Sequence, residues 1–165
     1  MRTLLKGLGI VPLVIAYIVS SCAIMVLPAG ARLRRRFLIK NTSVFSRIML
    51  ALLGIRVRVK HRERLHAGAT GRLVVANHVS YIDILVISSL MPSVFVTSVE
   101  LGSTVFLGTL ARHGGSRFVE RRKASGLTQE IAEIARVIGE GFAVALFPEG
   151  TTSIGERERP FKKSL

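Results

Sequence analysis

The stretch that decides the fold is Leu73-Val-Val-Ala-Asn-His-Val-Ser-Tyr-Ile-Asp-Ile-Leu-Val-Ile-Ser-Ser-Leu90. Its first four residues are apolar and predict a short buried strand. A short turn then leads into an apolar run over 82–90 that predicts a helix. Strands that alternate with helices are typical of α/β domains. The stretch therefore indicates an α/β domain with a polar turn at the end of a strand.

The alternation of strands and helices continues on both sides of this stretch. Residues 142–147 predict the clearest buried strand, because all six are apolar. Strict alternation in Ile55-Arg-Val-Arg-Val59 predicts a strand that is half buried or at an edge. The spacing of apolar residues predicts further helices over 102–112 and 124–140, and further strands over 94–99 and 117–120.

The N-terminal stretch 8–27 contains no charged residue. About 20 such residues are what a helix needs to cross the hydrocarbon core of a bilayer. Basic residues flank the stretch, and they are most frequent over 32–40, so the positive-inside rule places the main body of the chain on the cytoplasmic side. We expect a membrane anchor with its basic juxtamembrane segment over 1–40, and a second domain over 41–165.

Two other interpretations of the apolar stretch remain open. Its basic start and the sequence Val19-Ser-Ser-Cys22 resemble a bacterial lipoprotein signal, although the apolar run continues past the cysteine. Alternatively, the stretch forms one helix, or one of a pair of helices, embedded in a single leaflet. Apolar residues at helical spacing over 44–53 predict either the second helix of such a pair or a helix that packs on the domain core.

The composition excludes several classes of protein. With 49% hydrophobic and 21% charged residues, the chain is not a disordered basic tail. Its single cysteine excludes an intramolecular disulfide framework and a multi-cysteine zinc site. The net charge of +14 suits either nucleic acid or anionic lipid headgroups. We expect lipid and no nucleic acid, because no nucleic-acid-binding module or aromatic-basic platform accompanies the charge.

Three polar turns follow predicted strands, where ligands of α/β domains bind. In the first turn, His78 can accept a proton near neutral pH, and a carboxylate on its other ring nitrogen would fix the tautomer. Asp83 is the single aspartate of the chain and lies five residues further on. The two side chains can meet if His78 is in the turn and Asp83 is in the first turn of the helix. Both are catalytic candidates; the alternative is a helix-capping aspartate beside a surface histidine.

The second and third turns carry groups that suit binding. Residues 114–122 place two glycines beside guanidinium groups, which suits an anion, although a solvated charge run is the alternative. Residues 147–153 combine a proline, a glycine, a carboxylate and hydroxyls, which alone make an ordinary turn. The chain has no nucleophile elbow, P-loop or dinucleotide-binding fingerprint.

Together and in this order, the three turns resemble the motifs of the glycerolipid acyltransferase family, above all the 1-acylglycerol-3-phosphate (lysophosphatidate) acyltransferases. The N-H-x-S-x-x-D block is matched by Asn77, His78, Ser80 and Asp83; the G-x-x-F-[IV]-x-R block by Gly115, Phe118, Val119 and Arg121; and the F-P-E-G-T-[RT]-S block by Phe147, Pro148, Glu149, Gly150, Thr151 and Ser153. The resemblance covers roughly residues 55–165. It implies an α/β fold with a mixed sheet flanked by helices, preceded by a membrane helix.

The resemblance also implies an activity. A fatty acyl group would pass directly from acyl-carrier protein or acyl-CoA to the free hydroxyl of 1-acylglycerol 3-phosphate, giving phosphatidic acid without a metal or a bound cofactor. His78, oriented by Asp83, would be the general base. The expected partners are membrane lipid, the lysophospholipid acceptor and the thioester donor, at the bacterial inner membrane. The residues expected to bind substrate are Asn77, Ser80, Gly115, Arg117, Arg121, Glu149, Gly150, Thr151 and Thr152.

Two departures from the family pattern open alternatives. Thr152 stands where much of the family has an arginine associated with the acceptor phosphate. With residues 160–165, this resembles a subgroup that includes lyso-ornithine-lipid acyltransferases, so a phosphate-free acceptor is the second hypothesis. Family members also continue through more strands than this chain has. We therefore expect a chain truncated at its C-terminus, and an inactive membrane-associated fragment is the third hypothesis.

Overall fold

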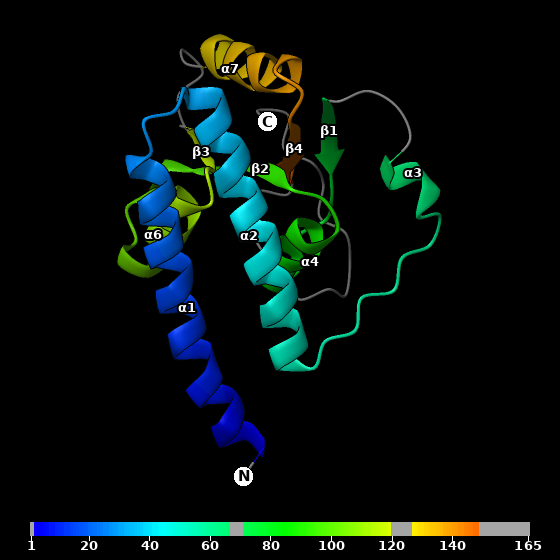
Figure 1. The fold of residues 1–165 in the computed structure, drawn as a ribbon. Helices are drawn as coiled ribbons and strands as arrows, with labels where there is room; N and C mark the ends of the chain where they lie inside the picture. The colour runs from blue at the N-terminus through cyan, green and yellow to red at the C-terminus, as the bar shows by residue number, and fades with distance from the viewer. Residues whose placement is uncertain (1, 67–70, 120–126, 149–165) are drawn as a thin grey trace. The chain divides into compact units, whose positions relative to one another are not determined.

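The computed structural model describes residues 2–66, 71–119 and 127–148 (Figure 1). The chain forms two compact units. The first consists of Met1–Gly68 and Ile84–Pro92, and the second of Ala69–Asp83 and Ser93–Leu165. The domain boundary expected after residue 40 falls inside an unbroken helix of the first unit.

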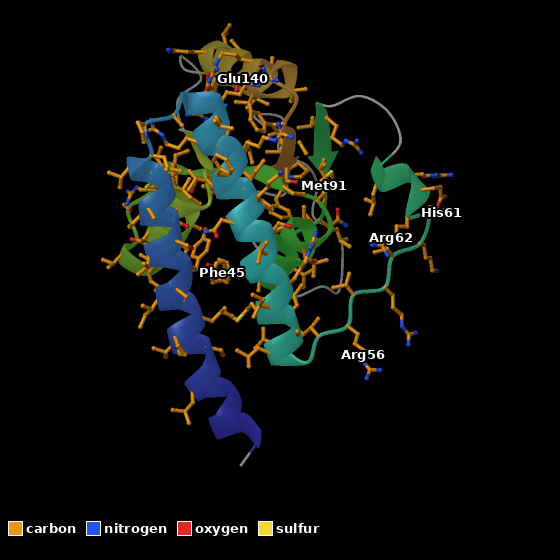
Figure 2. The ribbon with its side chains drawn as sticks, viewed as in Figure 1. Phe45, Arg56, His61, Arg62, Met91 and Glu140 are labelled. Atoms are coloured by element: carbon orange, nitrogen blue, oxygen red, sulfur yellow. The ribbon has the colours of Figure 1, made fainter. Side chains whose placement is uncertain are left out.

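The first unit is built on two long helices, α1 (Arg2–Val26) and α2 (Ala31–Leu53), which run antiparallel side by side (Figure 1). Polar side chains join them: Asn41 Nδ2 donates to the hydroxyls of Ser20 and Ser21, at 3.0 Å each. The Phe45 ring lies between the two helices and meets Tyr17 edge to face, with centroids 5.5 Å apart (Figure 2). The helices expected over 8–27 and 44–53 are therefore confirmed, and they form a pair.

Each of these helices leaves a row of apolar side chains exposed. The residues recur at helical spacing, so each row lies on one face of its helix. We call these rows the apolar stripes; they consist of Leu8, Val11, Ile15, Val19 and Val26 on α1, and Leu33, Phe37, Val44 and Ile48 on α2. Among the described residues, Gly7–Val26 is the one segment long and apolar enough to cross a membrane.

Residues 55–59, expected to be a strand, are extended but form no ladder with any described strand. That prediction is wrong, although the alternation is real: Ile55, Val57 and Val59 are half buried, whereas the basic residues between them are exposed. Arg56 and, further on, Arg62 extend away from the backbone of this segment (Figure 2). The segment leads to the short helix α3 (Glu63–His66). Period-two burial therefore arises here without strand pairing.

The helix α4 (Ile82–Leu90) was expected over the same residues and is confirmed. Its first two residues belong to the second unit and the remainder to the first. In the first unit, Arg47 Nε donates to the carbonyl oxygen of Ser89, at 2.8 Å. A guanidinium group on a carbonyl of the last helical turn is favourable, because that end of a helix carries partial negative charge.

The second unit contains a parallel sheet of four described strands in the order β1-β4-β2-β3. The central strand β4 has both of its edges paired, and the side chains of Val144 and Ala145 are almost completely buried. This explains why its residues are continuously apolar. All four strands lie where the sequence predicts them: β1 (Arg72–Val75), β2 (Ser93–Ser98), β3 (Arg117–Val119) and β4 (Ala143–Leu146).

The helix expected over 102–112 is confirmed as α6 (Val105–His113), which begins three residues later than expected. A short helix that the sequence did not predict, α5 (Val99–Gly102), precedes it. The break between the two helices has a local cause, because each helix has its own hydroxyl cap. Ser98 Oγ accepts from the Leu101 amide at the start of α5, and Thr104 Oγ1 accepts from the Gly108 amide at the start of α6. Such caps mark the beginning of a helix.

The last described helix, α7 (Leu127–Gly139), packs on the sheet. Its Val137 side chain is completely buried. The helix approaches the start of β1 so closely that a Cβ on Gly71 would overlap the backbone of Ile138. Gly141, with φ of 91°, then turns the chain into β4. The expected α/β fold is confirmed; an antiparallel strand, which a mixed sheet requires, is not among the described residues.

Candidate active site

Two of the three polar turns meet because β1 and β4 are neighbours in a parallel sheet. The pairing continues one residue past β1, where the Ala76 amide donates to the carbonyl oxygen of Leu146 at 3.2 Å. His78 follows two residues later, and Phe147 comes directly after β4. The carboxyl ends of neighbouring parallel strands lie at the same edge of a sheet. The first and third turns therefore begin side by side.

The predicted contact between His78 and Asp83 is present. The Nδ1 atom of His78 lies 3.1 Å from Oδ2 of Asp83. The same oxygen accepts from the amides of Val79, at 2.7 Å, and Ser80, at 2.9 Å. Ser80 Oγ in turn accepts from the Ile82 amide at 3.1 Å, so Ser80 and Asp83 cap the start of α4 reciprocally. Asp83 thus caps a helix and holds a histidine with one carboxylate.

This arrangement determines which nitrogen of His78 can act as a base. A carboxylate oxygen that already takes two amide protons acts as an acceptor, so His78 Nδ1 is the donor and carries the proton. Among the described residues, Nε2 of His78 has no hydrogen-bond partner. The side chain is 13% exposed and that of Asp83 is 28% exposed. The site can therefore take a proton at Nε2 while Asp83 stabilises the resulting imidazolium.

The imidazole of His78 also lies against an aromatic ring. The ring of Phe147 stacks on it, with centroids 4.2 Å apart and planes 21° apart. Phe95, from β2, stacks on Phe147 with centroids 6.2 Å apart. Tyr81 meets the imidazole edge to face at 6.5 Å. Sequence reasoning assigned no role to these rings; the available signals were the position of Phe147 directly after a buried strand and its place in the third motif block.

The second turn is placed differently. Gly115 has φ of 74° and reverses the chain after α6, as expected. Arg117, predicted to bind substrate, forms an ion pair with Glu133 of α7, at 2.6 Å, and Glu133 also pairs with Arg136 at 2.7 Å. β3 is three strand positions from β1, which corresponds to about 14 Å. The pairing gives Arg117 a structural role that links β3 to α7, and its binding role stays a prediction.

The remaining predicted binding residues divide into two groups. Asn77 is described and exposed, next to His78. The other predicted binding residues lie outside the described residues; they are Arg121, Glu149, Gly150, Thr151 and Thr152.

No group of three or more histidine, cysteine or acidic residues that could hold a metal ion occurs in the described part of the chain.

Comparison with known proteins identifies the family. A model of the acyltransferase family matches residues 56–165. The chain belongs to the acyltransferase family. The solved structure of the 1-acyl-sn-glycerophosphate acyltransferase PlsC from Thermotoga maritima is similar to this acyltransferase, with a TM-score of 0.71 and 24% sequence identity. The match covers 99% of this chain and 68% of that chain, and it confirms the fold.

Two groups of relatives resemble this acyltransferase. A lyso-ornithine lipid O-acyltransferase from Rhizobium meliloti is 43% identical over 122 residues, which are 72% of this chain and 40% of that protein. A 1-acyl-sn-glycerol-3-phosphate acyltransferase from Neisseria meningitidis is 34% identical over 117 residues, which are 71% of this chain and 45% of that protein. The matched part of the chain therefore covers less than half the length of these curated relatives.

Proposed function

We propose that this acyltransferase is a membrane-bound enzyme that acylates the free hydroxyl of 1-acylglycerol 3-phosphate, giving phosphatidic acid, with acyl-carrier protein or CoA as the thioester donor. Membership of the acyltransferase family supports acyl transfer. The observation that carries the mechanism is the contact between His78 Nδ1 and Asp83 Oδ2, because it leaves Nε2 of the imidazole available as a base.

The proposed reaction is a direct transfer without an acyl-enzyme. His78 Nε2 takes the proton of the acceptor hydroxyl as its oxygen attacks the carbonyl carbon of the thioester. When the C–S bond breaks, the proton passes from the imidazolium to the leaving sulfur. Asp83 stays ionised and stabilises the imidazolium between the two proton transfers. General-base catalysis of this kind contributes about 10²- to 10⁴-fold to the rate.

A second acceptor class is supported by a specific observation. Thr152 replaces the arginine that much of the family associates with the acceptor phosphate, and a relative named as a lyso-ornithine lipid O-acyltransferase shares 43% identity. The alternative substrate is thus a phosphate-free lysolipid. Under either proposal, Arg121 and the segment from Glu149 to Thr152 hold the polar head of the acceptor. Offering lysophosphatidate and lyso-ornithine lipid in parallel distinguishes the two.

Membrane association is part of the proposal. The apolar stripes of α1 and α2 supply hydrocarbon contacts, either across the bilayer or within one leaflet. The exposed basic residues of the chain suit anionic headgroups on the cytoplasmic side of a bacterial inner membrane. A membrane-embedded acceptor and a water-soluble thioester would then meet at the membrane surface.

The experiment follows thiol release from an acyl thioester in the presence of each lysolipid. His78→Gln should lower the rate by about 10²- to 10⁴-fold, because Gln cannot act as a base. His61→Gln is the matched control, since His61 is exposed and pairs only with Glu63 in the described structure. Equal rates for the wild type and His78→Gln would refute the assignment. No turnover by the folded wild-type chain with either acceptor would instead support the inactive fragment.

A further inference from the structure

We propose that Phe147 is a positioning residue, which fixes the plane of the His78 imidazole, and that Phe95, from the neighbouring strand β2, supports Phe147. This proposal rests on the proposed function, because the plane of the ring matters only if His78 transfers a proton. Phe147 is part of the third motif block, but neither ring was among the residues expected to be catalytic or to bind substrate. The contact itself can be measured independently of catalysis.

The hydrogen bond to Asp83 leaves one motion of His78 unrestrained. It holds Nδ1 near Oδ2, but the ring can still tilt about the line that joins these two atoms. The χ2 torsion of histidine does not prevent this, because it lies in a broad, roughly two-fold energy well. A catalytic group must be held within about 0.5 Å and about 10–20° of its productive position. A second contact, on the face of the ring, is therefore needed.

Phe147 supplies that face contact. Its ring is nearly parallel to the imidazole, at 21°, and the centroid separation of 4.2 Å places the two faces in direct contact. A tilt of the imidazole away from this plane would either overlap the Phe147 ring or lose the stack. The hydrogen bond and the stack together thus determine both the position of Nδ1 and the direction of Nε2.

Phe147 can position His78 because it is itself held firmly. Its side chain is buried, and Pro148 restricts its backbone to extended conformations. Phe95, from the neighbouring strand β2, lies nearly parallel to it, at 20° and with the centroids 6.2 Å apart. Phe95 belongs to β2, where it is directly opposite Ala145 of β4. The registers of the central strands therefore determine where the aromatic rings lie, and the rings determine the plane of the imidazole.

Nuclear magnetic resonance tests the contact without any substrate. The full chain, in detergent, is labelled in its histidine rings, and His78→Gln assigns the signal of His78. Ring protons above an aromatic face are shielded, so Phe147→Leu should move the His78 signals downfield, whereas Phe147→Tyr should keep them in place. Phe142→Leu is the matched control, because Phe142 is buried at the opposite end of β4. Unchanged His78 signals in Phe147→Leu would overturn the proposal.

Kinetics tests the purpose of the contact in the same variants. Phe147→Leu should lower kcat by about tenfold to a hundredfold and leave KM for the acceptor unchanged, because the base is misplaced but the lipid still binds. Phe147→Tyr should restore kcat, and Phe142→Leu should leave it unaltered. A moved His78 signal with an unaltered kcat would overturn the positioning role. Failure of the proposed function is recognised separately, by equal rates in the wild type and His78→Gln.

Discussion

Replacing Asp83 with Asn should disable the site and weaken the start of α4 together, because one carboxylate oxygen serves both. Oδ2 takes hydrogen bonds at 2.7, 2.9 and 3.1 Å. A hydrogen bond to a charged acceptor contributes about 1 kcal/mol more than a bond to a neutral one. Replacing the carboxylate by an amide therefore lowers the free energy of unfolding by at most about 3 kcal/mol for the three bonds. Because the side chain is 28% exposed and water offsets part of the loss, we expect a destabilisation of about 2 kcal/mol.

The effect on the rate should be much larger. If the amide oxygen of Asn faces the imidazole, it accepts the Nδ1 proton but carries no charge to stabilise the imidazolium. If the amide nitrogen faces it, the proton moves to Nε2 and the base is lost. Either result should lower kcat by about 10³- to 10⁴-fold, as found where an aspartate that orients a catalytic histidine is replaced by Asn.

The assay separates the two effects. Thiol release from an acyl thioester measures the rate, and thermal unfolding in detergent measures stability. Thr104→Ala is the control, because it removes a cap of α6 at a cost of about 1 kcal/mol and should not change the rate. The reasoning would be refuted if Asp83→Asn remained folded and turned over within about threefold of the wild-type rate.

Further predictions concern the sheet and the membrane. Gly71→Ala should destabilise the second unit, because the added Cβ would overlap the Ile138 backbone. At Gly139, an added Cβ would meet no other atom within 4 Å, so Gly139→Ala should raise the free energy of unfolding by about 0.5–1 kcal/mol. Denaturant unfolding compares them, and equal shifts would contradict the close approach. The second prediction neutralises three exposed cations, Arg56, Arg58 and Lys60. Their loss should weaken binding to anionic vesicles by about 1 kcal/mol each, or about 100-fold in all, and should leave binding to neutral vesicles unchanged. Vesicle flotation measures this loss, and unaltered binding to anionic vesicles would refute the prediction.

Local patterns predict local structure well in this chain. The apolar run over 142–147 predicts β4 because a central parallel strand is buried on both faces. The five-residue spacing of His78 and Asp83 allows their contact, since a turn followed by the first turn of a helix brings them together, and the resemblance to the family made the contact an expectation. Two errors arose where local pattern was ambiguous. Alternating burial occurs over 55–59 without a partner strand, and α6 begins after its Thr104 cap instead of at residue 102, where apolar spacing placed the start of the helix.

Contacts between distant segments could not be predicted in the same way. Nothing near Phe147 in the sequence indicates that β4 pairs with β1, and the stack on His78 follows from that pairing. Arg117 is a second residue whose contact with a distant segment could not be predicted from its neighbours in the sequence. Its neighbours suggest an anion site, but Glu133, sixteen residues further on, is close enough to neutralise it. Charge in a sequence does not reveal which charges are already paired in the fold.

The strand order also determines when the parts of the site can come together during synthesis. β1 and β2 both pair with β4 and not with each other, and the partner of Arg72 is Ala143, which is 143 − 72 = 71 residues later. The contact between His78 and Asp83 is local and can form early, whereas the ring of Phe147 arrives only after β4 has left the ribosome. Pairings across such separations form slowly. A nascent chain would therefore carry its proton-accepting pair well before the aromatic ring that orients it.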